Sequence, residues 1–296
     1  MRKFERLATE QRNVRTWDLD RLSIPEIVAT MAREDTLVPQ AVAAETTSIA
    51  RAVQLMAGRL AQGGRVLFAG AGTSGRLGVI EAAECPPTFG TPPALVQAAI
   101  AGGPRAVFRS VEGAEDDAKA GARAAGKLRR QDVLVGIAAS GVTPFVQGAL
   151  AAARKRGAGT ILVSCNGEGV PPDCAEAVIA VAVGPEVITG STRLKAGTAT
   201  KLVLNMLTVA TMVKLGKVYE NLMVDVQQKS AKLRHRARRI VRTLTGVDDA
   251  QADRALSAAG GNAKTAIVML RRGCPRKAAE ERLEKHGGFL RGALEG

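Results

Sequence analysis

Short apolar runs alternate with helical stretches through the middle of this 296-residue chain. Five runs predict buried strands, at residues 66–69, 94–100, 133–138, 160–164 and 177–183. Helical patterns separate several of them, near residues 75–84, 115–130, 144–156 and 196–216. Alternation at this spacing favours βαβ units. The chain is therefore predicted to be an α/β protein with a doubly wound parallel sheet flanked by helices.

Composition narrows the class of protein. Hydrophobic residues make up 46% of the chain and aromatic residues only 3%, so the core must rely on aliphatic side chains. No apolar run approaches the roughly 20 residues of a membrane span, and the N-terminus lacks the apolar core of a signal peptide. The four cysteines show neither CxxC nor Cys/His metal spacing. We expect a reduced, cytoplasmic protein with no membrane association and no structural zinc.

The net charge of +14 raises nucleic acid as a partner. About half of the excess lies in one stretch, KSAKLRHRARRIVR, at residues 229–242. Aliphatic residues separate its cations, and there is no aromatic ring to stack on a base. A solvated helix face is favoured over a nucleic-acid site, although the charge can still gather an anionic substrate.

Three regions are predicted along the chain. Residues 1–60 form an N-terminal helical segment, with an amphipathic stretch around 39–59. Residues 61–245 form the sheet domain. Residues 246–296 contain three short helical stretches, which predict a small helical bundle.

A glycine-rich loop, GAGTSG at 70–75, joins the first predicted strand to a helix. Free backbone N–H groups and the dipole at a helix start bind anions. The GxGxxG spacing also occurs in dinucleotide sites, which require an acidic residue at the end of the second strand. Here that strand ends in AIAGG (99–103). The hydroxyls of Thr73 and Ser74 suit a phosphate or a sugar better.

A second loop, ASGVTP at 139–144, also lies between a strand and a helix. Ser140 and Thr143 offer hydroxyls, and Gly141 allows close approach of the backbone. Alone, this loop could be a capped helix start. Two such loops at carboxyl ends of parallel strands indicate a ligand site for a phosphorylated small molecule.

Two groups of carboxylates lie near these loops. Glu81 and Glu84 are predicted at the end of the first helix, before CPP, and Glu115 with Asp116 and Asp117 at the start of a later one. A helix C-terminus raises a carboxyl pKa and an N-terminus favours the ionised form. Glu84 then suits a proton donor and Glu115 a base. From the residues alone, the simpler interpretation is favoured for Glu81 and Glu84, namely that they are ordinary exposed helix residues, and residues 115–117 could be only an acidic first turn.

Several long motifs carry a family resemblance. They are LATEQRN (7–13), GAGTSGRLGVIEAAECPPTFG (70–90), GAEDD (113–117), GPEVITGSTRLKAGTATKLVLNML (184–207) and GKVYENLMVDV (216–226). In these the chain resembles the N-acetylmuramic acid 6-phosphate etherases, a family built on the sugar isomerase (SIS) fold. The resemblance runs from about residue 4 to residue 270. The three-helix tail is similar to the ubiquitin-associated-like (UBA-like) end of that family.

The resemblance implies a carbon–oxygen lyase that removes the D-lactyl ether of N-acetylmuramic acid 6-phosphate. After ring opening, a base takes the C2 proton, lactate leaves C3 with the help of an acid, and water adds back. No metal or redox cofactor is needed, because two carboxylates in different protonation states suffice. The family places Glu84 and Glu115 in the active site, which reverses the simpler interpretation for these two residues but not for Glu81.

Substrate contacts also follow from the resemblance. We expect the phosphate on Ser140, Gly141 and Thr143, and the sugar hydroxyls or acetamido group on Thr73, Ser74 and Gly75. Ser191 and Lys195 are further candidates, because related sites are often completed by this region. The family implies a homodimer whose neighbouring subunits complete the site, and we expect a role in cell-wall recycling.

Two departures and two alternatives remain open. Val142 stands where the family commonly has Arg, and the sequence QKS at 228–230 departs from a usual Thr-Asn ending. A phosphosugar isomerase would share the fold, but His235 and His286 lie outside every motif. A non-catalytic phosphosugar-sensing regulator would need neither Glu84 nor Glu115, so their presence favours catalysis.

Overall fold

The computed structural model describes residues 7–167, 174–228 and 230–296. In these ranges five parallel strands form a single sheet in the order β2-β1-β3-β4-β5. The strands are β1 (Val66–Gly70), β2 (Val96–Ile100), β3 (Val133–Ile137), β4 (Gly159–Ser164) and β5 (Ala177–Ala180). The predicted doubly wound parallel sheet is thus confirmed. The strand order reverses between β1 and β3, where ligands bind in folds of this kind.

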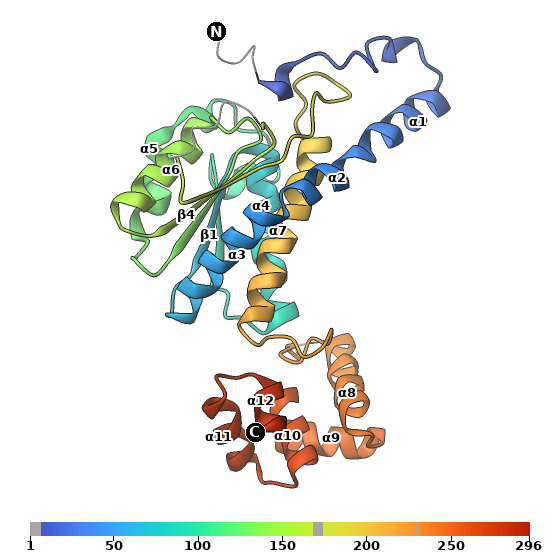
Figure 1. Ribbon diagram of the computed structural model, residues 1–296, viewed down its shortest axis with the longest axis vertical. Coiled ribbons are helices and arrows are strands. Elements are labelled where there is room, and N and C mark those ends of the chain that lie inside the picture. Colours follow the sequence, from blue (N-terminus) through green and yellow to red (C-terminus); the bar gives the residue numbers. More distant parts are fainter. Residues whose placement is uncertain (1–6, 168–173, 229) are drawn as a thin grey trace. The chain divides into compact units, whose positions relative to one another are not determined.

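Helices cover both faces of the sheet (Figure 1). On one face lie α5 (Ala118–Ala124) and α6 (Pro144–Lys155), whose apolar side chains share a core cluster with Leu134 and Leu162. On the other lie α3 (Thr46–Ala61), α4 (Gly72–Phe89) and α7 (Lys195–Lys214). Among the described helices, α7 alone has the length and hydropathy to cross a membrane, and 56% of its apolar window is buried.

The N-terminal segment is helical, as predicted. A short 3-10 helix (Ala8–Glu10) is followed by another (Leu19–Arg21), then by α1 (Ile24–Asp35) and α2 (Leu37–Ala44), which leads into α3. Ser23 and Glu26 form a capping box that fixes the start of α1. Residues 4–6, where the family resemblance begins, and Lys229 in the basic stretch lie outside the described residues.

The first helix after the glycine loop is longer than predicted. We expected it to stop at Glu84, yet α4 continues to Phe89 with Pro86 and Pro87 inside it. Proline inside a helix costs about 3 kcal/mol because it removes a hydrogen bond. Cys85 and Phe89, on either side of the prolines, are both buried, and this burial offsets the cost. Glu84 therefore lies more than one turn before the helix end, where the helix dipole acts on it only weakly.

Glycine ends α4. Gly90 adopts a positive φ of 66°, and its N–H donates to the carbonyl of Pro86 at 3.0 Å. A Cβ atom at Gly90 would lie 2.3 Å from the carbonyl oxygen of Asp225. Position 90 therefore requires glycine both for its conformation and for its contact.

The start of α5 also differs from the prediction. The helix expected at residue 115 begins at Ala118, because Asp117 caps it by accepting the N–H of Ala120 at 2.8 Å. This backbone hydrogen bond lowers the pKa of Asp117. Glu115 lies instead in a single 3-10 turn, Ala114–Asp116. The dipole of α5 therefore acts mainly on Asp117 and not on Glu115.

The chain divides into two compact units, with boundaries that differ from the predicted ones. Unit 1 contains Met1–Ala83 and Ala94–Thr208, so the N-terminal helices belong with the sheet. Unit 2 contains Glu84–Pro93 and Val209–Gly296, so it begins before residue 246.

Unit 2 includes the basic helix. Its helices are α8 (Ala231–Thr245), α9 (Asp249–Ala258), α10 (Ala263–Arg272), α11 (Arg276–Lys285) and α12 (Leu290–Glu295). Ile240 and Val241 of α8 are buried in the same core as the later helices. Arg238 and Arg242 pair with Asp253 and Asp249 of α9. In the described part of the tail, four helices follow residue 246 where we expected three.

Candidate functional site

A polar cavity of about 330 Å³ opens in unit 1 at the carboxyl ends of β1 and β3. It brings together four side chains that the sequence predicted for the site, namely Ser74, Glu115, Ser140 and Thr143. The rest of its lining comprises Glu10, Ala71, Asp116, Ile137, Ala139, Val142, Pro144, Gly190 and Thr192. The two glycine loops and the acidic turn thus converge on one site.

The second loop presents a helix start to this cavity. Gly141 has a φ of 78°, and its N–H donates to the carbonyl of Ala138 at 2.8 Å, which turns the chain sharply. Thr143 is the N-cap of α6, but its hydroxyl makes no capping hydrogen bond. The first N–H groups of a helix have no partner within it. The Thr143 hydroxyl and these N–H groups can therefore bind an anion together.

The first loop positions Ser74 through close packing. A Cβ atom at Gly75 would lie 2.6 Å from Cγ1 of Ile100 and 2.7 Å from the carbonyl oxygen of Gly70. Glycine at position 75 therefore lets α4 lie against the strand ends. Thr73 contacts the start of α7, where its methyl carbon is 3.6 Å from the position of a Cβ at Gly197. Thr73, Gly75 and Gly141 are not among the residues that line the cavity.

Three carboxylates line the cavity. Glu115 and Asp116 come from the acidic turn, and Glu10 comes from the N-terminal 3-10 helix. Asn166 accepts the N–H of Ala8 at 3.2 Å and so holds this helix in place. Glu10 was not predicted as a site residue. Its signal was its position inside LATEQRN, one of the motifs that carry the family resemblance.

The two glutamates of α4 differ in their surroundings. Glu84 is exposed and falls in the segment assigned to unit 2. Glu81 is buried, and it accepts hydrogen bonds from the hydroxyl of Thr208 and from Nδ2 of Asn205 at 3.2 Å. Glu81 thus joins α4 to α7. It is not the exposed helix residue that the sequence analysis considered.

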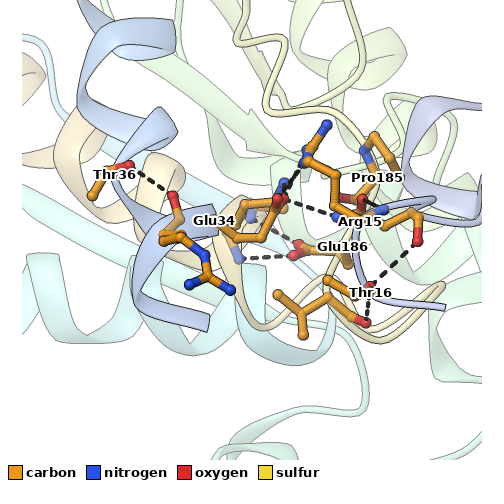
Figure 2. Close-up of polar contacts among 11 residues, drawn as sticks. Arg15, Thr16, Glu34, Thr36, Pro185 and Glu186 are labelled. Atoms are coloured by element: carbon orange, nitrogen blue, oxygen red, sulfur yellow. Dashed lines mark hydrogen bonds and ion pairs between the residues drawn. The ribbon is translucent and has the colours of Figure 1, made fainter. Parts of the chain in front are cut away.

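A buried ionic cluster is centred on Glu34, and Figure 2 shows it with Arg15 and Glu186. It adjoins the loop at residues 187–194, which contributes Gly190 and Thr192 to the cavity. Oε2 of Glu34 on α1 accepts hydrogen bonds from Nζ of Lys195 at 2.7 Å and from Nη2 of Arg15 at 2.9 Å. Nδ2 of Asn13 donates to the same oxygen at 2.8 Å. The Arg15 guanidinium, together with Lys195 and Asn13, lowers the pKa of Glu34 to about 2 despite burial. This carboxylate is therefore ionised at neutral pH.

A second buried carboxylate caps α7. Glu186 accepts the N–H groups of Lys195 and Ala196, each at 2.9 Å, while its burial raises its pKa. The hydroxyl of Thr16 donates to the carbonyl of Val187 at 2.9 Å. Together with the Glu34 cluster, these bonds fix both ends of the 187–194 loop. Lys195 is fully buried, and neither it nor Ser191 lines the cavity.

A larger groove, of about 760 Å³, lies beside β2 and α5 and is lined mainly by apolar side chains. It contains neither hydroxyl-bearing loop, so we assign the site to the smaller polar cavity. In the described ranges, no three His, Cys, Asp or Glu side chains are grouped so as to hold a metal ion.

Known proteins resemble this chain over almost its whole length. It is 51% identical over 293 residues to N-acetylmuramic acid 6-phosphate etherase of Mycolicibacterium smegmatis, covering 97% of each chain. It is 50% identical over 294 residues to the etherase of the same name from Geobacillus thermodenitrificans, covering 99% of this chain and all of the relative. The chain belongs to the N-acetylmuramic acid 6-phosphate etherase family.

Two further similarities concern the fold of this family member. Residues 48–154 match the model of the glucokinase regulatory protein N-terminal SIS domain. A solved structure of a proposed phosphosugar isomerase involved in capsule formation from Bacteroides fragilis superposes with a TM-score of 0.51. It is 18% identical and covers 67% of this chain and 95% of that one, a likeness in fold alone. The SIS-type sheet expected for the etherase family is thus confirmed.

Proposed function

We propose that this protein cleaves the D-lactyl ether of N-acetylmuramic acid 6-phosphate, giving N-acetylglucosamine 6-phosphate and D-lactate. The observation that carries the proposal is the identity of 50–51% to etherases of this name over essentially the full chain. The polar cavity supports it, because hydroxyls and a helix start suited to a phosphate lie beside ionisable carboxylates. The isomerase and the sensor are less well supported, since the relatives at this identity are named etherases.

The reaction is proposed to proceed by elimination and hydration, which makes the enzyme a carbon–oxygen lyase. Glu115 takes the C2 proton of the ring-opened sugar, whose C1 aldehyde makes that proton acidic. Glu84, which does not line the cavity in this structure, is proposed to protonate the departing lactyl oxygen and then to activate the water that adds to C3. Two carboxylates can divide these tasks only if one is protonated while the other is ionised.

The substrate is proposed to bind with its phosphate at the start of α6, on Ser140, Thr143 and the backbone at Gly141. Ser74 then faces the sugar, while Thr73 and Gly75 act through the placement of the loop. Ser191 belongs to the 187–194 loop and Lys195 to the cluster that adjoins it. These two therefore support the site indirectly in this proposal.

The decisive experiment measures D-lactate release from N-acetylmuramic acid 6-phosphate by the wild type, Glu84→Gln and Glu115→Gln. In ²H₂O the wild type should also introduce deuterium at C2, and in H₂¹⁸O the label should enter the C3 hydroxyl of the sugar. Release without exchange at C2 would contradict elimination. Phosphosugar binding without any release would instead support a sensor.

We also propose that the enzyme acts as a homodimer in the cytoplasm and serves cell-wall recycling. Large apolar side chains support self-association, because Trp17, Ile24 and Val28 of the N-terminal segment are 66%, 78% and 60% exposed. Burial of such side chains in an interface is favourable. Light scattering on the purified protein would test the dimer, and a monomer at working concentration would contradict it.

A further inference from the structure

A small recess adjoins the polar cavity and contains an arginine that the proposed reaction has not used. The recess has a volume of about 70 Å³. Ala71 and Glu115 line both it and the larger cavity, so the two spaces are neighbours on either side of the proposed base. Arg76, from the first turns of α4, lines the recess.

The orientation of Arg76 is fixed at one end. Its Nε donates to the carbonyl oxygen of Val107 at 2.9 Å. A guanidinium has five N–H donors in a rigid plane, so this bond leaves the Nη1 and Nη2 pair free to bind a carboxylate with two parallel hydrogen bonds. Among the residues that the structure describes, no carboxylate forms an ion pair with Arg76. The positive charge is therefore available to a ligand.

Charge makes this arginine distinctive. The described residues lining the two neighbouring spaces include four carboxylates, on Glu10, Glu112, Glu115 and Asp116, and one cation, on Arg76. The proposed substrate carries two anionic groups. Its phosphate can bind the helix start at α6, but a second anion near these carboxylates would be repelled. Among the described residues that line the two spaces, only Arg76 in the recess offers a cation to compensate.

The chemistry of the substrate assigns the recess to that second anion. The lactyl group is attached at C3, next to the C2 atom whose proton Glu115 is proposed to take. A lactyl carboxylate attached at C3 therefore lies near Glu115, three carbon atoms along the sugar from the C6 that bears the phosphate. The recess has the matching position, since Glu115 forms the boundary between it and the larger cavity.

We infer that Arg76 binds the carboxylate of the lactyl ether and thereby selects the ether substrate over phosphosugars that lack this group. The inference rests on the proposed function and deepens it. Arg76 is here a specificity-determining residue, whereas Glu84 and Glu115 carry the proton transfers. Binding the leaving group at its far end also holds the ether bond in place beside the base.

The test compares two substrates in three proteins. The substrates are N-acetylmuramic acid 6-phosphate and its lactyl carboxamide, which keeps the ether but loses the charge. The proteins are the wild type, Arg76→Met and the control Arg105→Met, which changes an exposed arginine that lines neither space. The rate of lactate or lactamide release gives kcat/KM for each protein with each substrate. Calorimetry gives the affinity of each protein for N-acetylglucosamine 6-phosphate.

In the wild type and Arg105→Met, kcat/KM should favour the acid over the amide by about 10- to 100-fold, the range for a hydrogen bond between charged groups. In Arg76→Met this preference should disappear, with unchanged affinity for N-acetylglucosamine 6-phosphate. Arg76→Lys should retain part of the preference, because it keeps the charge and loses the planar fork.

Three results would overturn the inference. The first is a preference for the acid that persists in Arg76→Met. The second is equal use of acid and amide by the wild type. The third is a loss of affinity for N-acetylglucosamine 6-phosphate in Arg76→Met that is as large as its loss of kcat/KM for the acid. If Arg76→Met does not fold, Arg76→Lys carries the same test, and equal use of the two substrates by the wild type still overturns the inference. Cleavage of neither substrate by the wild type would overturn the proposed function, and this inference with it.

Discussion

Glu34 and Lys195, 161 positions apart in the chain, form an ion pair of 2.7 Å that is almost entirely removed from solvent. The pair links α1 to the first residue of α7, next to the 187–194 loop that contributes two residues to the polar cavity. Buried charges are tolerated only when they are paired. The pair thus holds the loop at the cavity in a fixed position.

Removal of the Lys195 ammonium should therefore destabilise the protein. Lys195→Met leaves the Glu34 carboxylate buried with fewer donors, and we expect the free energy of unfolding to fall by about 3 kcal/mol. Urea denaturation measures this change. Lys155→Met, at an exposed position of α6, is the control and should have little effect. Unchanged stability with a raised KM would instead assign Lys195 to the substrate.

The same cluster predicts a dependence of stability on pH. The pKa of Glu34 falls from its usual 4.5 to about 2 in the folded protein, because of Arg15, Lys195 and Asn13. A lowered pKa in the folded state stabilises the protein above the unfolded pKa, by roughly 3 kcal/mol here. This stability is lost as the pH falls from about 4.5 toward 2.

Denaturation curves at several pH values test this dependence. Glu34→Gln should be less stable than the wild type at neutral pH, and it should lose less stability between pH 4.5 and 2. Glu281→Gln, which changes an exposed glutamate of unit 2, should keep the wild-type slope. Identical slopes for the wild type and Glu34→Gln would contradict the assignment.

Gly75 should tolerate no side chain. In Gly75→Ala the new Cβ would meet Ile100 and the carbonyl of Gly70 at less than 3 Å, so α4 must move away from the strand ends. Overpacking of this kind costs about 1–3 kcal/mol, and the displacement of Ser74 should raise KM for the phosphosugar. Thermal denaturation and steady-state kinetics measure the two effects.

A matched glycine serves as the control for this substitution. Gly58 lies within α3, and a Cβ there would meet nothing within 4 Å. Gly58→Ala should stabilise the protein by up to about 1 kcal/mol, because alanine favours the helix. If both glycine variants behaved alike, the close approach at Gly75 would have no energetic importance.

Val142 lines the cavity at the start of α6, where the family commonly has arginine. Val142→Arg should lower KM for the phosphosugar by about tenfold, since a charge-assisted bond to phosphate adds roughly 1.5 kcal/mol. The difference in KM between Val142→Arg and the wild type should become smaller as salt is added. Val142→Leu adds bulk without charge and should not lower KM. A lower KM that does not depend on salt would indicate that the new side chain acts through packing and not through its charge.

Local patterns predicted most of the fold. Each apolar run became a strand of the parallel sheet. The central strands β1, β3 and β4 are buried along their whole length, which requires an unbroken run of such residues. The two hydroxyl-bearing loops met at one cavity, because carboxyl ends of neighbouring parallel strands share an edge. Ser74, Ser140, Thr143 and Glu115 line that cavity as a consequence.

Features that depend on distant residues could not be predicted in this way. The rule that proline ends a helix failed at Pro86, where burial of neighbouring side chains outweighs the lost hydrogen bonds. No spacing in the sequence indicates that Lys195 meets Glu34, or that Glu10 reaches the strand ends. Lys195 is paired with Glu34, whereas Arg76 has no carboxylate partner among the described residues, and this difference is visible only in the structure.

The long separation between Glu34 and Lys195 has a consequence for the order in which the protein is made. The segment bearing Asn13 and Arg15 is synthesised long before Lys195, and until then Glu34 has these two partners but lacks the Lys195 ammonium. A nascent chain that ends at residue 190 contains both glycine loops and the acidic turn, and Asn166 and Val187 can already bind Ala8 and Thr16, but the Glu34 cluster still lacks its ammonium. Completion of the buried Glu34 cluster is therefore a late event, and contacts of such long range form slowly.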